Sequence, residues 1–253
     1  MTQTTTALIL AAGVGARLRP LTNEIPKALV KVGQQSILQR AIRILRAHGI
    51  QRFVLATGYR RTAIEELVDS LGIDAQLVDN PRFDSTQNSV SLARCADAVS
   101  GQSFLKLDGD LLFDAELLRR VDRGSAGLQV AVDRSATLDA EAMKVEIDDD
   151  RRITRFGKGL PLNRAHAESI GVERVSADAA VHLFDALQRH LREDRVDLYY
   201  EDVYDELISA GLLQARAIDV GDLDWMEIDT LLDLERARSR FGDRSPPQSA
   251  AGR

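Results

Sequence analysis

Two glycines and two cations lie close together near the start of the chain, in a pattern suited to binding phosphate groups. Gly13 and Gly15 follow the apolar run 6–12, and Arg17 and Lys27 come next. Glycines after a strand let the backbone approach a ligand without a Cβ, and they present N–H groups to phosphate oxygens. The segment lacks the Gly-Lys-Ser/Thr of a P-loop and the third glycine of the dinucleotide fingerprint. The two glycines alone therefore indicate only that a phosphate can approach.

The elements around this loop are predicted from the spacing of apolar residues. A short apolar run ended by glycines is typical of a buried strand, and apolar spacings of three and four predict amphipathic helices. Ser36 is the expected N-cap and Gly49 the expected end of one helix, and Thr62 with Glu65 forms an expected capping box. The predicted strands span 6–12, 53–56, 75–78 and 104–107, and the predicted helices run from Ser36 to His48, from Thr62 to about Leu71-Gly72, and over 90–99.

This alternation of strands and helices brings two polar segments to one edge of a sheet. It favours βαβ units and a parallel sheet, whose ligands bind beyond the carboxyl ends of the strands. Gly13 and Gly15 follow the first predicted strand, and Asp108-Gly109-Asp110 follows the fourth. We therefore expect the glycine loop and these carboxylates to converge on one site.

The pattern changes after residue 125, where short strands alternate with Asp- and Gly-rich turns such as Asp148-Asp149-Asp150. The fold class expected is α/β, a Rossmann-like three-layer sandwich with a mostly parallel central sheet and a small β-hairpin and helical subregion. A single domain is expected over 1–243, followed by a disordered tail over 244–253. The predicted strands of this half are 128–132, 143–147 and 153–156, and its predicted helices are 176–191, 201–210 and 229–240.

Composition excludes several classes of protein. With a net charge of −6 the chain has no face-wide excess of Lys and Arg, so no nucleic-acid partner is expected. No apolar run approaches the ~18 residues of a membrane span, so no membrane insertion is expected. Cys95 is the single cysteine, which excludes an intramolecular disulfide and favours a cytoplasmic location. The sequence is compatible with a homo-oligomer and does not specify the oligomeric state.

The glycine loop belongs to a longer string that resembles a known signature. Leu-Ala-Ala-Gly-x-Gly-x-Arg-Leu-x-Pro-Leu-Thr, followed by Pro-Lys-Ala-Leu, is similar to the signature of the sugar-phosphate nucleotidyltransferase superfamily. The resemblance implies that Arg17 holds the triphosphate and the leaving pyrophosphate, and that Lys27 stabilises the attacked α-phosphate. It also implies that the loop binds the nucleotide, through Leu10, Ala11, Ala12, Gly13 and Gly15.

The same resemblance implies a magnesium site. Asp110 matches the aspartate that binds the metal in the sugar enzymes, and Asp229 with Glu227 matches the second metal segment of the family. Carboxylates and phosphate oxygens are the ligands that Mg²⁺ prefers. Asp229 has an alternative use as the N-cap of a helix starting near Leu231. Asp108 is assigned to nucleotide binding.

Over residues 6–240 the chain is similar to the small cytidylyltransferases, which act on phosphocholine, aminoethylphosphonate or inositol phosphate. Asn88 and Ser91 match the Asn-x-x-Ser-Leu of that branch and are assigned to nucleotide binding. The sequence departs from the branch at Ala167-Glu168-Ser169, which weakens any assignment of Glu168 to the substrate. Lys144 and Lys158 are acceptor-phosphate candidates or ordinary hairpin charges. The remaining acceptor candidates are the aromatic Tyr199, Tyr200 and Trp225, which could instead anchor a helix, and the nearby carboxylate Glu201.

The resemblance implies a reaction between a nucleoside triphosphate and a small phosphorylated acceptor. A phosphate oxygen of the acceptor, such as phosphocholine, attacks the α-phosphorus of the triphosphate, expected to be CTP, and pyrophosphate leaves. The nucleotide half is expected over about 1–125 and the acceptor half over about 126–243. The alternatives are an inositol-phosphate cytidylyltransferase, a sugar-1-phosphate uridylyl- or thymidylyltransferase, and, from another class, an inactive nucleotide-sensing subunit.

Overall fold

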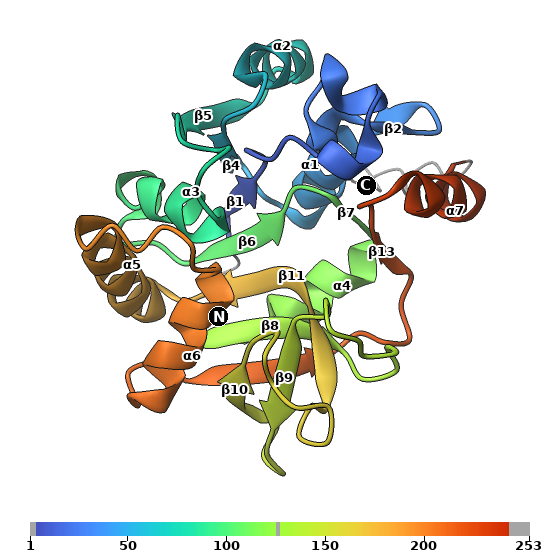
Figure 1. Cartoon of the computed structure of the whole chain (residues 1–253). Helices are drawn as coiled ribbons and strands as arrows, with labels where there is room; N and C mark the ends of the chain where they lie inside the picture. The colour runs from blue at the N-terminus through green and yellow to red at the C-terminus, as the bar shows by residue number, and fades with distance from the viewer. Residues whose placement is uncertain (1–3, 125–126, 243–253) are drawn as a thin grey trace, which may run out of the picture.

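A computed structural model describes residues 4–124 and 127–242, and the expected tail over 244–253 lies outside them. One nine-stranded sheet runs through both halves of the described chain (Figure 1). Within the described residues, no helix is long and apolar enough to cross a membrane. In spatial order the strands are β5 (Asp74–Asp79), β4 (Arg52–Thr57), β1 (Thr6–Leu10), β6 (Phe104–Asp108), β11 (Ala167–Val175), β8 (Leu128–Asp133), β12 (Ala215–Asp219), β10 (Arg152–Phe156) and β9 (Lys144–Ile147).

Helices cover both faces of the sheet, which makes the expected three-layer sandwich. Alternate residues of β1 enter different cores: Leu8 packs into one cluster and Ile9 into the other. The cluster of Leu8 is completed by α3 (Asn88–Arg94), α5 (Ala177–Arg192) and α6 (Tyr200–Ser209). The cluster of Ile9 is completed by α1 (Ile37–His48), α2 (Arg61–Leu71) and α4 (Ala115–Val121).

Strand direction differs between the two parts of the sheet. β5, β4, β1 and β6 pair in parallel, as the alternation of strands and helices predicts. β11 then runs antiparallel to β6 and β8, while β12 returns parallel to β8. β10 pairs antiparallel with both β12 and β9. The sheet as a whole is therefore mixed, and β11, which the sequence did not predict as a strand, joins its two parts.

Local signals predict helix ends with mixed success. The Ser36 hydroxyl accepts a hydrogen bond from the Gln39 N–H, and Gly49 ends α1 in the left-handed region at φ 109°, as predicted. The predicted capping box at Thr62 is wrong. The helix α2 begins at Arg61, directly after Arg60 in the left-handed region at φ 49°. Thr62 therefore lies inside the first turn, past the position of a cap.

A buried polar cluster ties the sheet together at the end away from the glycine loop. The carboxylate of Asp122, which follows α4, lies 3.2 Å from Arg174 Nε on β11 and 3.1 Å from His48 Nε2 at the end of α1. Burial opposes ionisation of this carboxyl group, but hydrogen bonds from His48 and Thr4 hold its pKa below the ordinary 3.8. The ionised Asp122 therefore links three elements of the scaffold.

Candidate active site

A small two-stranded sheet brings carboxylates together that are more than a hundred residues apart in sequence. β7 (Leu111–Phe113) pairs antiparallel with β13 (Trp225–Glu227), so that Leu111 stands opposite Glu227. The Ile228 N–H donates to the Asp110 carbonyl oxygen at 3.1 Å. Carboxylate oxygens of Asp110, Glu227 and Asp229 consequently lie within 4.8 Å of one another.

Asp229 is available to this cluster because its neighbour caps the next helix. The N-cap of α7 (Leu231–Phe241) is Thr230, whose hydroxyl accepts from the Asp233 N–H at 3.2 Å. The Asp233 carboxylate in turn accepts from the Thr230 N–H at 2.8 Å. The alternative of Asp229 as the N-cap is therefore wrong, since a capping box one residue later performs that task.

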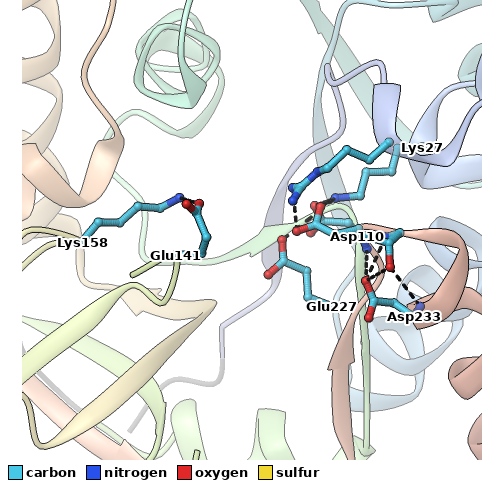
Figure 2. A network of polar contacts seen from close by, with 9 residues as sticks. Lys27, Asp110, Glu141, Lys158, Glu227 and Asp233 are labelled. Carbon is cyan, nitrogen blue, oxygen red and sulfur yellow. Dashed lines mark hydrogen bonds and ion pairs between the residues drawn. The ribbon is translucent and has the colours of Figure 1, made fainter. Parts of the chain in front are cut away.

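Lys27 lies at the centre of the carboxylate cluster (Figure 2). It begins the short 3-10 turn η3 (Lys27–Leu29), and Pro26 before it is extended. Its Nζ lies 2.6 Å from Asp110 Oδ2, 2.5 Å from Asp229 Oδ1 and 4.0 Å from Glu227 Oε1. One ammonium thus lies within 4.0 Å of three carboxylates.

The glycine loop supports this lysine from the other side. Gly15 adopts φ +69°, and a Cβ added there would lie 2.8 Å from the Lys27 Cβ. A glycine is therefore required at position 15, because of this close approach and because of the left-handed backbone conformation. Arg17, two residues later, is 65% exposed and places Nη2 2.8 Å from Asp229 Oδ2. Arg17 and Lys27 therefore both contact Asp229, and their roles toward the phosphate groups stay predictions.

The charge balance of the cluster favours an added cation. Burial opposes the charge on Lys27, but the carboxylates of Asp110 and Asp229 raise the pKa of its ammonium above the ordinary value. Desolvation, followed by the charges of Asp110 and Asp229, raises the pKa of Glu227 to about 8, although half of that side chain is exposed. Asp110 Oδ1 is buried without a hydrogen-bond partner among the described residues. Three hard oxygen donors with an unsatisfied buried atom fit a divalent cation such as Mg²⁺.

Two cavities meet at this cluster. One cavity of about 320 Å³ lies over the glycine loop, and a second of about 410 Å³ extends toward β11 and α6. They are called the nucleotide-side and acceptor-side cavities after the roles predicted for their residues. Leu10, Ala11, Ala12 and Gly13, which the signature assigns to nucleotide binding, line the first cavity, whereas Gly15 lines neither. Sequence reasoning missed Phe83, Thr86 and Gln87 in its wall. The residues common to both cavities are Lys27, Asn88, Asp108, Asp110 and Glu227.

The floor between the cavities rests on a buried charge network that sequence reasoning did not find. Lys106 is fully buried, with Nζ 2.8 Å from Asp108 Oδ1 and 3.3 Å from Glu173 Oε2. The Tyr200 hydroxyl donates to Asp108 Oδ2 at 2.8 Å, and its ring lies 3.4 Å from the Lys106 ammonium. Gly171 is required beside this network, because a Cβ there would lie 2.3 Å from Asp108 Oδ2. Lys106 and Tyr200 therefore fix the two carboxylate oxygens of Asp108 from the buried side of the site.

The polar residues of the Asn-x-x-Ser motif also have structural partners. Asn88 Oδ1 accepts from the Tyr200 N–H at 2.9 Å, which ties the start of α3 to the start of α6. Ser91 Oγ accepts from Asn80 Nδ2 at 3.0 Å. Both residues line the nucleotide-side cavity. Their direct contact with a nucleotide stays a prediction.

The structure divides the predicted acceptor residues into two groups. Lys158, Tyr199 and Glu201 line the acceptor-side cavity, together with Glu168, which the sequence comparison had set aside. The other three predicted residues are absent from the described lining. Lys144 is buried, and its Nζ donates to the carbonyl oxygens of Asp139 and Ala142. Tyr200 is buried beneath Asp108, and Trp225 Nε1 donates to Asp133 Oδ2 at 2.9 Å.

Comparison with known proteins identifies the family of the chain. The family model described as nucleotidyl transferase matches residues 6–157, which is more than half of the chain. The chain belongs to this family. The matched segment contains the glycine loop, Lys27 and Asp110, whereas the partner strand β13 and Asp229 lie beyond it.

Relatives and solved structures of the family extend the likeness over most of the chain. It is 29% identical to the CMP-5'-(3-aminopropyl)phosphonate synthase of Streptomyces rubellomurinus over 96% of this chain and 39% of that protein. It is 28% identical to the bifunctional IPC transferase and DIPP synthase of Thermococcus kodakarensis, over 92% of this chain and 49% of that protein. The chain thus spans half or less of the length of these two relatives. The structure of the inositol-1-phosphate CTP transferase from T. maritima matches with a TM-score of 0.79 at 23% identity, over 96% of this chain and 98% of that one.

Proposed function

We propose that the chain catalyses magnesium-dependent transfer of a nucleotidyl group, CMP from CTP, to a small phosphorylated acceptor, with release of pyrophosphate. The observation that carries the proposal is the shared wall of the two cavities. Lys27, Asp110 and Glu227 border both of them. A triphosphate in one cavity and an acceptor phosphate in the other would meet at this wall.

The reaction needs positioning and charge neutralisation more than covalent chemistry. An oxygen of the acceptor phosphate forms a bond to the α-phosphorus, and the bond from that phosphorus to the pyrophosphate oxygen breaks. The Lys27 ammonium stands where the two phosphates approach, and Arg17 stands at the edge on the acceptor side. Asp110, Glu227 and Asp229 would hold Mg²⁺, which when bound neutralises phosphate charge. Two like charges ~4 Å apart repel by about 4 kcal/mol at an effective dielectric near 20, which the cations offset.

Cytidylyl transfer is supported by the relative that is named for a CMP product. The inositol-phosphate acceptor and the uridylyl or thymidylyl transfer considered from the sequence are alternatives that the same site geometry accommodates. The acceptor and the base are therefore tested in one experiment.

The test is a pyrophosphate-release screen of CTP, UTP, dTTP and ATP against phosphocholine, phosphoethanolamine, aminoethylphosphonate, inositol 1-phosphate and hexose 1-phosphates. We expect release with CTP and a loss of about 100-fold or more in kcat for Lys27→Ala. Lys31→Ala, which removes an exposed lysine outside both cavities, is the matched control and keeps the parental rate. Release only with UTP or dTTP and a hexose phosphate contradicts cytidylyl transfer. A Lys27→Ala protein as fast as the parent contradicts the catalytic role of Lys27.

A further inference from the structure

The far end of the acceptor-side cavity is lined by more carboxyl groups than cations. Away from the Lys27 cluster, its wall comes from β11, the start of α6, the loop before β9 and Lys158 after β10. One cation, Lys158, faces this end among the described lining residues. The carboxylates that line the same end are Asp139, Glu141, Glu168 and Glu201.

Two of these carboxyl groups have oxygens that the described residues do not satisfy. Glu201 is 5% exposed, and its Oε2 has no hydrogen-bond partner among the described residues. Burial raises the pKa of Glu201 to about 8, although Lys106 and a hydrogen bond from Tyr200 oppose the rise. The Glu168 side chain is half-buried, and it makes no hydrogen bond or ion pair within the described part of the chain. Burial, followed by the charges of Asp139 and Asp133, raises the pKa of Glu168 above its ordinary value. An unsatisfied buried carboxyl oxygen is unfavourable, so a cation with hydrogen-bond donors that entered here would stabilise the ionised form of both groups.

A primary ammonium already occupies part of this end. The Lys158 Nζ lies 3.3 Å from Glu141 Oε2 and 4.9 Å from the centre of the Tyr199 ring. Figure 2 shows the Lys158–Glu141 pair on one side of the site, with Lys27 and Asp110 on the other. The chain's own side chain therefore demonstrates that the wall accommodates an alkylammonium group.

The aromatic residues do not form a cage for a quaternary ammonium. Such a group binds against several ring faces, since its methyl groups cannot donate hydrogen bonds. Tyr199 is the single aromatic residue among the described lining of this cavity, and Lys158 already lies over its ring. Tyr200 lies below the floor against Lys106, and Trp225 is outside the lining. A polyol can donate hydrogen bonds to Glu168 and Glu201, but it brings no positive charge to neutralise them.

We infer that the acceptor is a phosphate monoester or phosphonate that carries a primary ammonium at its other end, received by Glu168 and Glu201. The inference rests on the proposed function and names the substrate class of its acceptor cavity. Its phosphate lies toward Lys27 and Arg17, and its ammonium donates hydrogen bonds to the Glu168 carboxylate and to Glu201 Oε2, which has no partner among the described residues. Hydrogen bonds to charged groups contribute about 1.5–3 kcal/mol, equivalent to about 10- to 100-fold in kcat/KM.

The test compares acceptors that differ at one end only. With CTP and Mg²⁺, kcat/KM is measured for phosphoethanolamine, phosphocholine, ethyl phosphate and inositol 1-phosphate. Phosphocholine adds three N-methyl groups to phosphoethanolamine, and ethyl phosphate removes the ammonium. We expect phosphoethanolamine to exceed each of the others by about 10-fold or more.

Variants assign the effect to a residue. In Glu168→Gln the ratio of kcat/KM for phosphoethanolamine to that for ethyl phosphate falls about 10-fold, mainly through KM. Asp149→Asn removes an exposed carboxylate from the β9–β10 turn and keeps the parental ratio. Phosphocholine or inositol 1-phosphate as the most efficient acceptor overturns the inference, and so does an unchanged ratio in Glu168→Gln. Absence of pyrophosphate release with every triphosphate and acceptor refutes the proposed function itself.

Discussion

Replacing Lys106 by Met tests whether the buried charge network supports the floor of the site. The ammonium lies 2.8 Å from Asp108 Oδ1 and 3.3 Å from Glu173 Oε2, and both Lys106 and Glu173 are fully buried. At an effective dielectric near 20, these separations correspond to attractions of about 6 and about 5 kcal/mol. Desolvation of the charges offsets most of that energy. Removal of one partner from a buried pair leaves the other uncompensated, which destabilises by about 3–5 kcal/mol.

The loss of stability should depend on pH in a defined direction. Burial, partly offset by Lys106, raises the pKa of Glu173 from 4.5 to about 7. Without Lys106 that pKa rises further. A carboxyl group whose folded pKa exceeds its unfolded pKa binds more protons in the folded state, so stability falls as pH rises between the two values. The deficit of Lys106→Met relative to the parent therefore widens above pH 7, where Glu173 of the parent ionises beside its lysine.

Urea unfolding at pH 6 and pH 8 measures both effects. Lys31→Met is the matched control, because Lys31 is exposed, and its free energy of unfolding should stay within about 0.5 kcal/mol of the parent. The double variant Lys106→Met with Glu173→Gln should recover part of the loss, since the uncompensated charge is gone. A Lys106→Met protein as stable as the parent at pH 8 refutes the idea that the network stabilises the floor.

Three further predictions concern the metal cluster and the scaffold. Asp110→Asn should weaken Mn²⁺ binding, followed by calorimetry, by about 10-fold or more, and chelation of divalent cations should abolish pyrophosphate release; equal affinity excludes Asp110 as a ligand. Gly171→Ala should lose about 1–3 kcal/mol in urea unfolding, because φ is +76° and the new Cβ would meet Asp108; unchanged stability contradicts that close contact. Asp122→Asn should lose about 3 kcal/mol at pH 7, since Arg174 is left unpaired. The pKa of Asp122 in the folded parent lies below the ordinary 3.8, so the parent loses this stabilisation as pH falls from 3.8 through that lower value. The difference in stability between parent and variant should therefore shrink over this pH range. A constant difference across it contradicts an ionised Asp122.

Local patterns in the sequence predicted those parts of the fold and site that depend on local physics. The ends of α1 follow from the cap at Ser36 and the glycine at 49, and both are as expected. The convergence of the glycine loop with Asp110 follows from the rule that parallel strands end at one edge. The approach of Asp229 to Asp110 came from resemblance alone, because no local signal indicates the pairing of β7 with β13.

The parts that were missed depend on contacts across the sheet. β11 reads as Ala-Glu-Ser-Ile-Gly-Val-Glu-Arg-Val, and its charged residues disguise a strand buried along most of its length. Its pairing with β8 shifts in register between Ser169 and Glu173, around Gly171, which breaks the alternation expected of a regular strand. In the sequence alone, nothing distinguishes Lys106 and Glu173 from exposed charged residues. They become a buried pair only when β6 and β11 lie side by side.

The origin of the two cavity walls has an evolutionary consequence. Lys27, the aspartates at the end of β6 and Glu227 form the wall shared by the two cavities, where we propose that the phosphate groups react. The far wall of the acceptor side belongs to separate elements, β11, α6 and the loop before β9. Substitutions on those elements can change which molecule is accepted while Lys27 and its carboxylates stay in place. A duplicated gene could thus acquire a new acceptor through a few side chains and inherit the phosphate chemistry intact.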